Sequence, residues 1–558
     1  MINTQFWWLS VPHAGVWSRK GLVVVVELRP WRAAGPRLRR GLTRVADAVR
    51  PPLARAAAAS GPRVARLARA ASPRVARITR VKTWQYTAGA ATAGLALAAG
   101  LVTAAGPWDS TGQRTAERVR AAAADHAGGA SHGGASGRGG TSGTEGPRPA
   151  PSAASVLAGL GGAKGTGRPG PDARALAATL DPLLADPALG PRRAAAVVDI
   201  ATGERLYGTA EAEPLTPAST TKIATAVAAL SALGPEHRLT TRAVFEPDTK
   251  ELVLVGGGDP TLTADRDAEG RASLRTLAAK TAAALEKRDV RAVTLSYDTT
   301  LYAGSDLHPI GVNDNLARVT ALMADEARTD DSASGPATRH PDPAAAATRA
   351  FADFLEAEGV RTTAPGPSKA TGRADRLAAV SSPPLSALVE QMLTNSDNDI
   401  AEALARHTAI ATGERPDFAG AGRAVEARLK KLGLPVEGAV IKDGSGLDRT
   451  GKLTASLLTA LLTTAADPAH PELRPTLTGL PVAGFTGTLT TRYGDGAAGL
   501  VRAKTGTLTG VNALAGTVVD DSGRVLAFAF LTSDTLDTSA AQSALDRTAT
   551  ALAACTCD

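Results

Sequence analysis

One helix constrains this chain more than any other stretch of its sequence. After Lys222, residues 223–230 are almost entirely apolar on every side, with Thr225 the only interruption. Such a pattern is typical of a helix buried in a domain core. The helix nevertheless carries Lys222 in its first turn, three residues after Ser219. Because burying an ammonium group is unfavourable unless it is paired or neutralised, this pair of residues requires an explanation.

A chemical explanation follows from the spacing of Ser219 and Lys222. Side chains three residues apart share one face of a helix. A serine hydroxyl becomes a good nucleophile when a base takes its proton, and desolvation lowers the pKa of a lysine so that it can be that base. Ser-x-x-Lys alone is a weak signal, since a capping serine beside an exposed lysine has the same spacing.

Two further motifs strengthen the case. Ser396-Asp397-Asn398 and Lys504-Thr505-Gly506 follow in the order of the signature of penicillin-binding proteins and serine β-lactamases. The chain resembles most closely the class C penicillin-binding proteins, which are D-alanyl-D-alanine carboxypeptidases and endopeptidases. The resemblance covers about residues 172–535, and three more stretches contribute to it: residues 254–263, 321–328 and 443–454.

The resemblance implies an α/β (α+β) fold, a β-lactamase/transpeptidase-like sandwich of an antiparallel sheet flanked by helices, with an inserted smaller domain. Sequence patterns agree, because two strands flank a tight turn at 201–203 and three successive strands lie within 501–532. The predicted divisions are residues 172–238 for the first part of the catalytic domain, 239–375 for the inserted domain and 376–558 for the second part.

The resemblance also implies a role for each motif residue. Ser219 is expected to attack the penultimate D-Ala carbonyl, and Lys222 to accept its proton. Ser396 would relay a proton, and Asn398 would orient Lys222 and the substrate amide. The expected substrate-binding residues are Lys504, Thr505, Gly506 and Thr507: the first two bind the terminal carboxylate, the glycine leaves room for a substrate strand, and the backbone N–H groups of Thr507 and Ser219 form the oxyanion hole.

The implied function is a serine-type D-Ala-D-Ala carboxypeptidase that acts on peptidoglycan stem peptides without a cofactor and is inhibited by β-lactam antibiotics. DD-endopeptidase activity remains open, as do a serine β-lactamase and a catalytically impaired penicillin-binding module. The sequence has no asparagine between Asn398 and Asn512, so it lacks the Glu-x-x-x-Asn loop of class A β-lactamases. Neither the eight histidines nor Cys555 and Cys557 show metal-ligand spacing, so no metal site is predicted.

The N-terminal third is predicted to be a membrane tether. Residues 1–82 hold 17 of the 62 Lys and Arg residues, and part of this basic cytoplasmic arm is expected to come from a misassigned start. Residues 83–106 are expected to be one transmembrane signal-anchor, with the catalytic domain extracytoplasmic, or secreted if the segment is cleaved. Residues 107–171 form a disordered linker rich in Gly, Ala and Pro. The basic charge belongs to this arm, so no nucleic-acid binding is expected.

Overall fold

The structure is a computed structural model that describes residues 173–494 and 496–555. These residues belong to one compact unit of the chain. The predicted basic arm, membrane span and linker (residues 1–82, 83–106 and 107–171) lie outside the described residues. Within the described part of the chain, no helix has the length and apolar character needed to cross a membrane.

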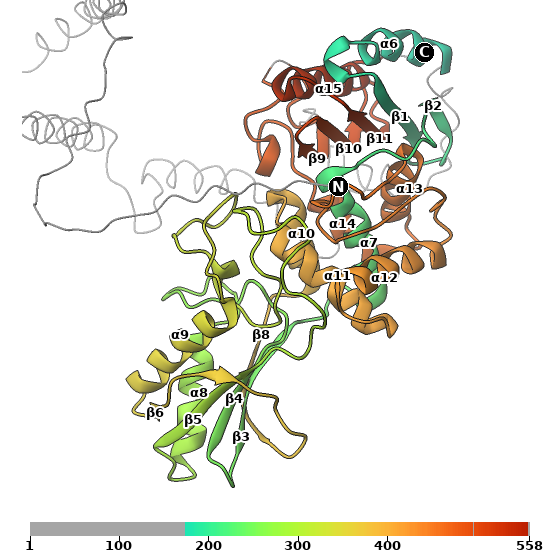
Figure 1. Ribbon diagram of the computed structural model, residues 1–558. Coiled ribbons are helices and arrows are strands. Elements are labelled where there is room, and N and C mark those ends of the chain that lie inside the picture. Colours follow the sequence, from blue (N-terminus) through green and yellow to red (C-terminus); the bar gives the residue numbers. More distant parts are fainter. Residues whose placement is uncertain (1–172, 495, 556–558) are drawn as a thin grey trace, which may run out of the picture. The chain divides into compact units, whose positions relative to one another are not determined.

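The main sheet consists of five antiparallel strands in the order β2-β1-β11-β10-β9 (Figure 1). They are β1 (Arg192–Asp199), β2 (Arg205–Thr209), β9 (Val501–Leu508), β10 (Val511–Val519) and β11 (Val525–Ser533). The strands predicted around residues 201–203 and within 501–532 are therefore confirmed. Strands from the two ends of the described chain lie side by side, since Arg192 is paired with Ser533. β9 is at the edge of this sheet, and on its outer side Arg502 forms an isolated antiparallel bridge with Val482.

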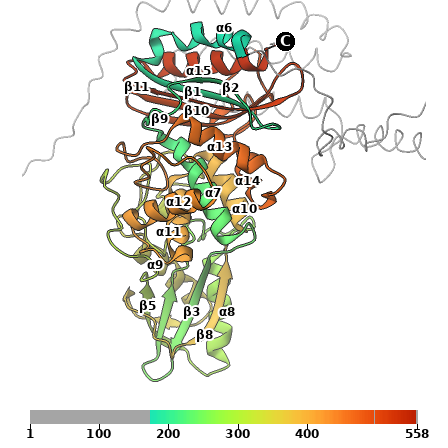
Figure 2. The same ribbon diagram turned by 90° about the vertical axis from the view of Figure 1, so that its right-hand side faces the viewer.

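Helices cover both faces of this sheet, as Figure 2 shows. On β11, Phe528 and Phe530 pack against the outer helices α6 (Ala173–Leu184) and α15 (Thr538–Ala553). The intervening Ala527 and Ala529 face the inner helices, because successive side chains of a strand point to opposite faces. The inner helices are α7 (Thr221–Leu233), α10 (Leu385–Asn395), α11 (Asn398–Thr412), α12 (Phe418–Lys431), α13 (Ala455–Ala466) and the short α14 (Pro475–Thr478).

Helix α7 lies at the centre of the inner layer. Every residue from Thr221 to Leu230 is buried, as the uniformly apolar sequence predicts. Its C-terminal cap is Gly234, whose φ is +82°. A helix packed on all sides is a rigid support, and the first turn of α7 is the part that carries Lys222.

A second sheet and two helices follow α7. The strands are β3 (Thr240–Glu246), β4 (Glu251–Val255), β5 (Ala292–Asp298), β6 (Arg361–Thr362), β7 (Gly366–Pro367) and β8 (Asp375–Ser381). Helices α8 (Leu274–Glu286) and α9 (Pro343–Ala357) share a separate apolar core with this mixed sheet. The predicted boundary at residue 375 coincides with the first residue of β8, so this sheet extends six residues further, to Ser381.

Glycines at 256–258 join the second sheet to the inner helices. A Cβ atom on Gly257 would lie 2.2 Å from the carbonyl oxygen of Thr240, and one on Gly256 would lie 2.4 Å from that of Ala321. A Cβ atom on Gly258 would lie 2.4 Å from Nε2 of His407 on α11. These glycines therefore permit close backbone packing.

Candidate active site

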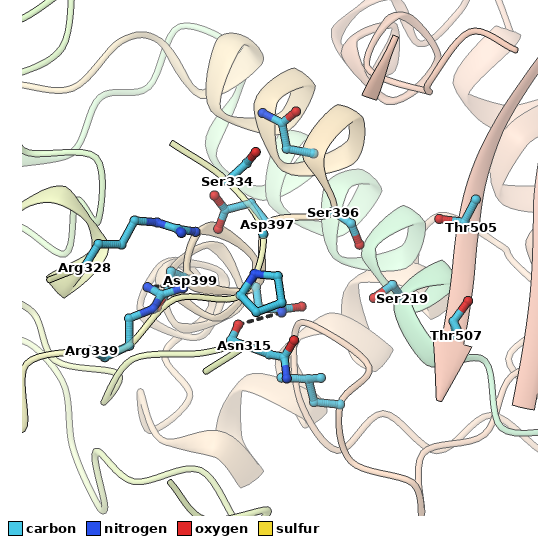
Figure 3. A pocket seen from close by; sticks show the side chains of 15 residues that line it. Ser219, Asn315, Arg328, Ser334, Arg339, Ser396, Asp397, Asp399, Thr505 and Thr507 are labelled. Carbon is cyan, nitrogen blue, oxygen red and sulfur yellow. Dashed lines mark hydrogen bonds and ion pairs between the residues drawn. The ribbon is translucent and has the colours of Figure 1, made fainter. Parts of the chain in front are cut away.

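The three motifs meet in one pocket of about 230 Å³ (Figure 3). Ser219 enters it from the turn before α7, Ser396 and Asn398 from the junction of α10 and α11, and Thr505 and Thr507 from the edge strand β9. Segments separated by more than 280 residues thus supply facing walls. The folded chain brings every predicted site residue to this region, with Lys222 and Lys504 buried behind the lining.

A tight turn presents Ser219 to the pocket. The turn is a single 3-10 element, Ala218–Thr220, and Ala218 has a φ of +48°. The left-handed region is unfavourable for residues with a Cβ atom, so the surrounding packing must impose this conformation. Part of that packing is Gly446, where a Cβ atom would lie 1.9 Å from the carbonyl oxygen of Ala218.

Gly506 supports the same turn. That this glycine leaves room for a substrate strand stays a prediction, and the structure gives it a further contact. A Cβ atom at this position would lie 2.6 Å from the carbonyl oxygen of Pro217 and 3.2 Å from the Cβ of Ala218. The absence of a side chain therefore lets β9 approach the turn that carries Ser219.

Lys222 is completely buried and has three oxygen partners. Its Nζ donates hydrogen bonds to Ser219 Oγ at 3.0 Å, Asn398 Oδ1 at 2.7 Å and the carbonyl oxygen of Ser445 at 2.8 Å. Burial lowers the pKa of Lys222 to about 8, although the negative charges of Asp443 and Glu402 oppose this shift. The neutral amine is therefore far more accessible near neutral pH than in an ordinary lysine, which makes Lys222 suited to accept a proton.

Ser396 faces a second buried lysine. Lys504 Nζ donates to Ser396 Oγ at 2.9 Å and to the carbonyl oxygen of Thr505 at 2.9 Å. Burial, helped by the positive charge of Lys222, holds the pKa of Lys504 well below its usual value. Ser396 itself has a φ of +60° as the C-cap of α10. The backbone is therefore strained at the residue whose hydroxyl accepts the hydrogen bond from Lys504.

The residues beside Ser396 have distinct roles. Asp397 accepts a hydrogen bond from the backbone N–H of Ile400 and caps α11. The next residue, Asn398, points the oxygen of its amide at Lys222, and its Nδ2 donates to the carbonyl oxygen of Asn315 at 2.8 Å (the dashed line in Figure 3). Asn315 was not identified from the sequence.

Two threonines of β9 line the pocket on its other side. Thr505 Oγ1 donates to Thr488 Oγ1 at 3.0 Å, and Gln542 of α15 donates to Thr507 Oγ1 at 3.1 Å. Both β9 hydroxyls therefore have fixed neighbours in the absence of substrate. Thr488 belongs to the 3-10 turn Gly487–Leu489, and sequence reasoning did not single it out.

Buried acids support the loop beneath Lys222. Glu402 accepts from the backbone N–H groups of Gly444 and Ser445, at 3.2 and 2.9 Å. Asp443 pairs with His308, with Nε2 and Oδ2 3.0 Å apart. The turn at 443–448 therefore holds the Ser445 carbonyl that contacts Lys222. Glu402 could have been found from its position, because it lies one helical turn after Asn398.

Two groups of side chains in the described residues have spacings compatible with a metal ion: His308, Glu402 and Asp443, and separately Glu326, Asp397 and Asp399. In both groups the carboxylate oxygens already accept hydrogen bonds from backbone N–H groups, from His308 or from arginines. The geometry is thus accounted for by contacts within the protein.

Sequence comparisons identify the relatives of this chain. The profile of the D-Ala-D-Ala carboxypeptidase 3 (S13) family matches residues 176–332 and 329–552. A carboxypeptidase of Mycobacterium tuberculosis is 36% identical over 428 residues, which cover 74% of this chain and 90% of the relative. Carboxypeptidase DacB of Mycolicibacterium smegmatis is 37% identical over 406 residues, which cover 70% of this chain and 86% of the relative.

A solved structure shows the same fold. Penicillin-binding protein 4 of Haemophilus influenzae superimposes with a TM-score of 0.53 at 21% identity, covering 68% of this chain and 97% of the other. The described part of the chain therefore has the α/β fold of penicillin-binding proteins, with an antiparallel sheet and flanking helices. Sequence and fold together show that the chain belongs to the D-Ala-D-Ala carboxypeptidase 3 (S13) family.

Proposed function

We propose that this chain is a serine-type D-Ala-D-Ala carboxypeptidase that cleaves peptidoglycan stem peptides through an acyl-enzyme on Ser219. The observation that carries the proposal is the completely buried Lys222, whose Nζ lies 3.0 Å from Ser219 Oγ in the pocket. Hydrogen-bond contact between a nucleophile and a base of lowered pKa is what serine activation requires. The family relationship supplies the substrate class.

The acylation step follows from these contacts. Ser219 Oγ attacks the carbonyl carbon of the penultimate D-Ala, while neutral Lys222 takes the hydroxyl proton. The ammonium that forms already contacts Asn398 Oδ1 and the Ser445 carbonyl oxygen. These two oxygens stabilise its charge without any rearrangement of the site. The backbone N–H groups of Ser219 and Thr507 bind the developing oxyanion.

The leaving group departs on the side of Ser396 and Lys504. Ser396 Oγ, 2.9 Å from Lys504 Nζ, passes its proton to the leaving amine and receives in return the proton that Lys222 took from Ser219, so the amine departs neutral and Lys222 is again a free base. The carboxylate of the terminal D-Ala binds Lys504 and the hydroxyl of Thr505, because an ammonium–carboxylate contact is a strong charge-assisted hydrogen bond. In deacylation Lys222 takes a proton from the attacking water, the water oxygen bonds to the acyl carbon, and that proton passes to Ser219 Oγ as the ester bond breaks.

A product analysis tests this proposal. The full-length chain in detergent is incubated with a disaccharide-pentapeptide and with a cross-linked dimer, and the products are read by mass spectrometry. Release of D-Ala from the first substrate supports a carboxypeptidase, and cleavage of the second adds endopeptidase activity. A labelled penicillin should attach to Ser219. Labelling of Ser219→Ala would contradict the assignment, while Ser543→Ala, which alters a hydroxyl bonded only to its own helix, is the matched control.

We also propose that the enzyme works outside the cell membrane, tethered by residues 83–106. The support is the uncharged run at 84–106, preceded by Arg77, Arg80 and Lys82, which favours a cytoplasmic N-terminus. Fractionation of cells that express the full chain, followed by protease treatment of intact spheroplasts, tests this. A catalytic domain protected from external protease would contradict the proposal.

A further inference from the structure

A buried ion pair lies next to the predicted catalytic Asn398. Arg339 Nη1 donates to Asp399 Oδ2 at 2.8 Å, and only 6% and 3% of the two side chains are exposed. Arg339 belongs to the loop between η5 (Asp325–Ala327) and α9, whereas Asp399 is in the first turn of α11. Both residues line the pocket that contains Ser219. The three motifs do not include either residue.

Asp399 also contacts a third segment. Its other carboxylate oxygen, Oδ1, accepts a hydrogen bond from the backbone N–H of Ala317 at 3.0 Å. Two residues earlier in that segment, the carbonyl oxygen of Asn315 accepts from Asn398 Nδ2 at 2.8 Å. Asp399 therefore holds in place the segment whose backbone oxygen binds the neighbouring Asn398.

The contact with Asn315 decides which end of the Asn398 amide faces Lys222. An asparagine side chain has a donor end and an acceptor end. Because Nδ2 is engaged by the Asn315 carbonyl, Oδ1 is directed at Lys222 Nζ, 2.7 Å away. If the Asn315 carbonyl moved, Asn398 could rotate and present its N–H groups to the lysine, which would repel the ammonium form.

We propose that Arg339 and Asp399 are positioning residues whose ion pair holds residues 315–317 against α11 and thereby fixes Asn398 Oδ1 on Lys222. This inference rests on the proposed function of Ser219 and Lys222. It assigns the loop before α9 a part in catalysis, although Arg339 touches neither Ser219 nor Lys222. Figure 3 shows Arg339 and Asp399 together on the side of the pocket away from Thr505 and Thr507.

The electrostatics of the pair are consistent with this role. Burial raises the pKa of Asp399 to about 7, and the Arg339 guanidinium opposes that shift. Without Arg339, Asp399 would be protonated over more of the neutral range and would hold the Ala317 N–H less strongly. The charged groups that face Lys222 are Lys504 from β9, Asp443 from the loop beneath it, Asp399 and Glu402 from α11, and Asp397, the N-cap of α11.

The test compares variants of the full-length chain by the rate of acylation with a labelled penicillin, measured from about pH 5 to about pH 10. Arg339→Met should acylate about 100-fold more slowly at saturating penicillin, the size of effect expected from misplaced catalytic groups. The penicillin concentration for half-saturation should be unchanged. The midpoint of the pH profile should fall, because the Lys222 ammonium loses the acceptor oxygen of Asn398. Arg339→Lys, which keeps the charge, should restore most of the rate.

The matched control is Arg492→Met. Arg492 makes a bidentate pair with Asp546, with contacts of 2.9 and 2.5 Å and side chains 16% and 19% exposed, and neither residue lines the pocket. This variant should have a lower unfolding temperature and the parental pH midpoint. The inference is overturned if Arg339→Met keeps the parental acylation rate and pH midpoint. It is also overturned if Arg339→Met is slower but keeps the same pH midpoint as Arg492→Met.

The inference can still be tested if a variant does not fold. If Arg339→Met does not fold, the acylation rate and pH profile of Asp399→Asn are measured instead. This variant keeps an oxygen for the Ala317 N–H but not the charge opposite Arg339. A slower rate with a lower midpoint supports the inference, and a parental profile overturns it. If the parent enzyme is not acylated at Ser219, the proposed function fails and the inference fails with it. Normal labelling of the parent together with unaffected variants overturns the inference alone.

Discussion

Lys222 Nζ and Ser219 Oγ lie 3.0 Å apart at the start of α7, and the lysine has no exposed surface. In this arrangement the amine donates to the hydroxyl, which is the resting state of the pair. Activation requires the neutral amine, which accepts the proton instead. The protonation state of Lys222 therefore controls the reaction.

The pH profile of acylation should follow the Lys222 pKa. Burial lowers that pKa to about 8, and only the neutral amine acts as a base, so the acylation rate should rise with pH and level off above about 8. Stopped-flow measurement with a chromogenic β-lactam gives the profile. A rate that keeps rising towards about pH 10.4, the ordinary lysine value, would show that Lys222 is not the base.

Lys504 should be required for recognition of the substrate carboxylate. Lys504→Met should lose acylation by both penicillin and D-Ala-D-Ala peptides, because the only ammonium expected to meet the carboxylate is removed. The parent enzyme should already hydrolyse a C-terminally amidated peptide poorly. Lys452→Met is the control, since Lys452 Nζ contacts Thr216 and belongs to none of the three motifs. Equal rates for free and amidated peptides would contradict this role.

At position 396, acylation and stability are expected to favour different residues, because acylation needs the serine hydroxyl and the positive φ favours glycine. Its φ of +60° is in the region that costs a residue with a Cβ atom about 1–2 kcal/mol. Ser396→Gly and Ser396→Ala both remove the hydroxyl, but only glycine relieves the strain. We expect both to lose acylation, and the glycine variant to have a free energy of unfolding higher than the alanine variant by about 1 kcal/mol. Denaturant unfolding measures the difference, and equal stabilities would argue against strain.

The penicilloyl-enzyme should be long-lived. The sequence lacks a class A deacylation loop, and the lining carboxylates Asp397 and Asp399 are directed towards Arg328 and Arg339 in Figure 3 rather than towards Ser219. Penicillin should therefore give a burst of acylation followed by almost no turnover, while D-Ala release from peptides continues. Sustained penicillin hydrolysis at about ten per second, an ordinary enzymatic rate, would favour a serine β-lactamase instead.

Sequence by itself determined the local features of the fold and the identities of the motif residues. The apolar run after Lys222 predicts a buried helix, and the successive strand-like runs at the C-terminal end predict β10 and β11, because both depend only on the local sequence. The order of the three motifs led to the family. Their spacing in the chain did not show how the motifs meet.

Tertiary structure alone decided which groups surround the catalytic atoms. The Ser445 carbonyl contacts Lys222 across 223 residues, and Arg339 reaches Asp399 across 60. Gly506 faces Pro217, a contact that its place in the Lys-Thr-Gly motif does not reveal. These contacts come from irregular loops, whose paths follow no periodic pattern and are set by packing between distant segments. For that reason the nucleophile and its base could be identified from the sequence, whereas the residues that hold them in place could not.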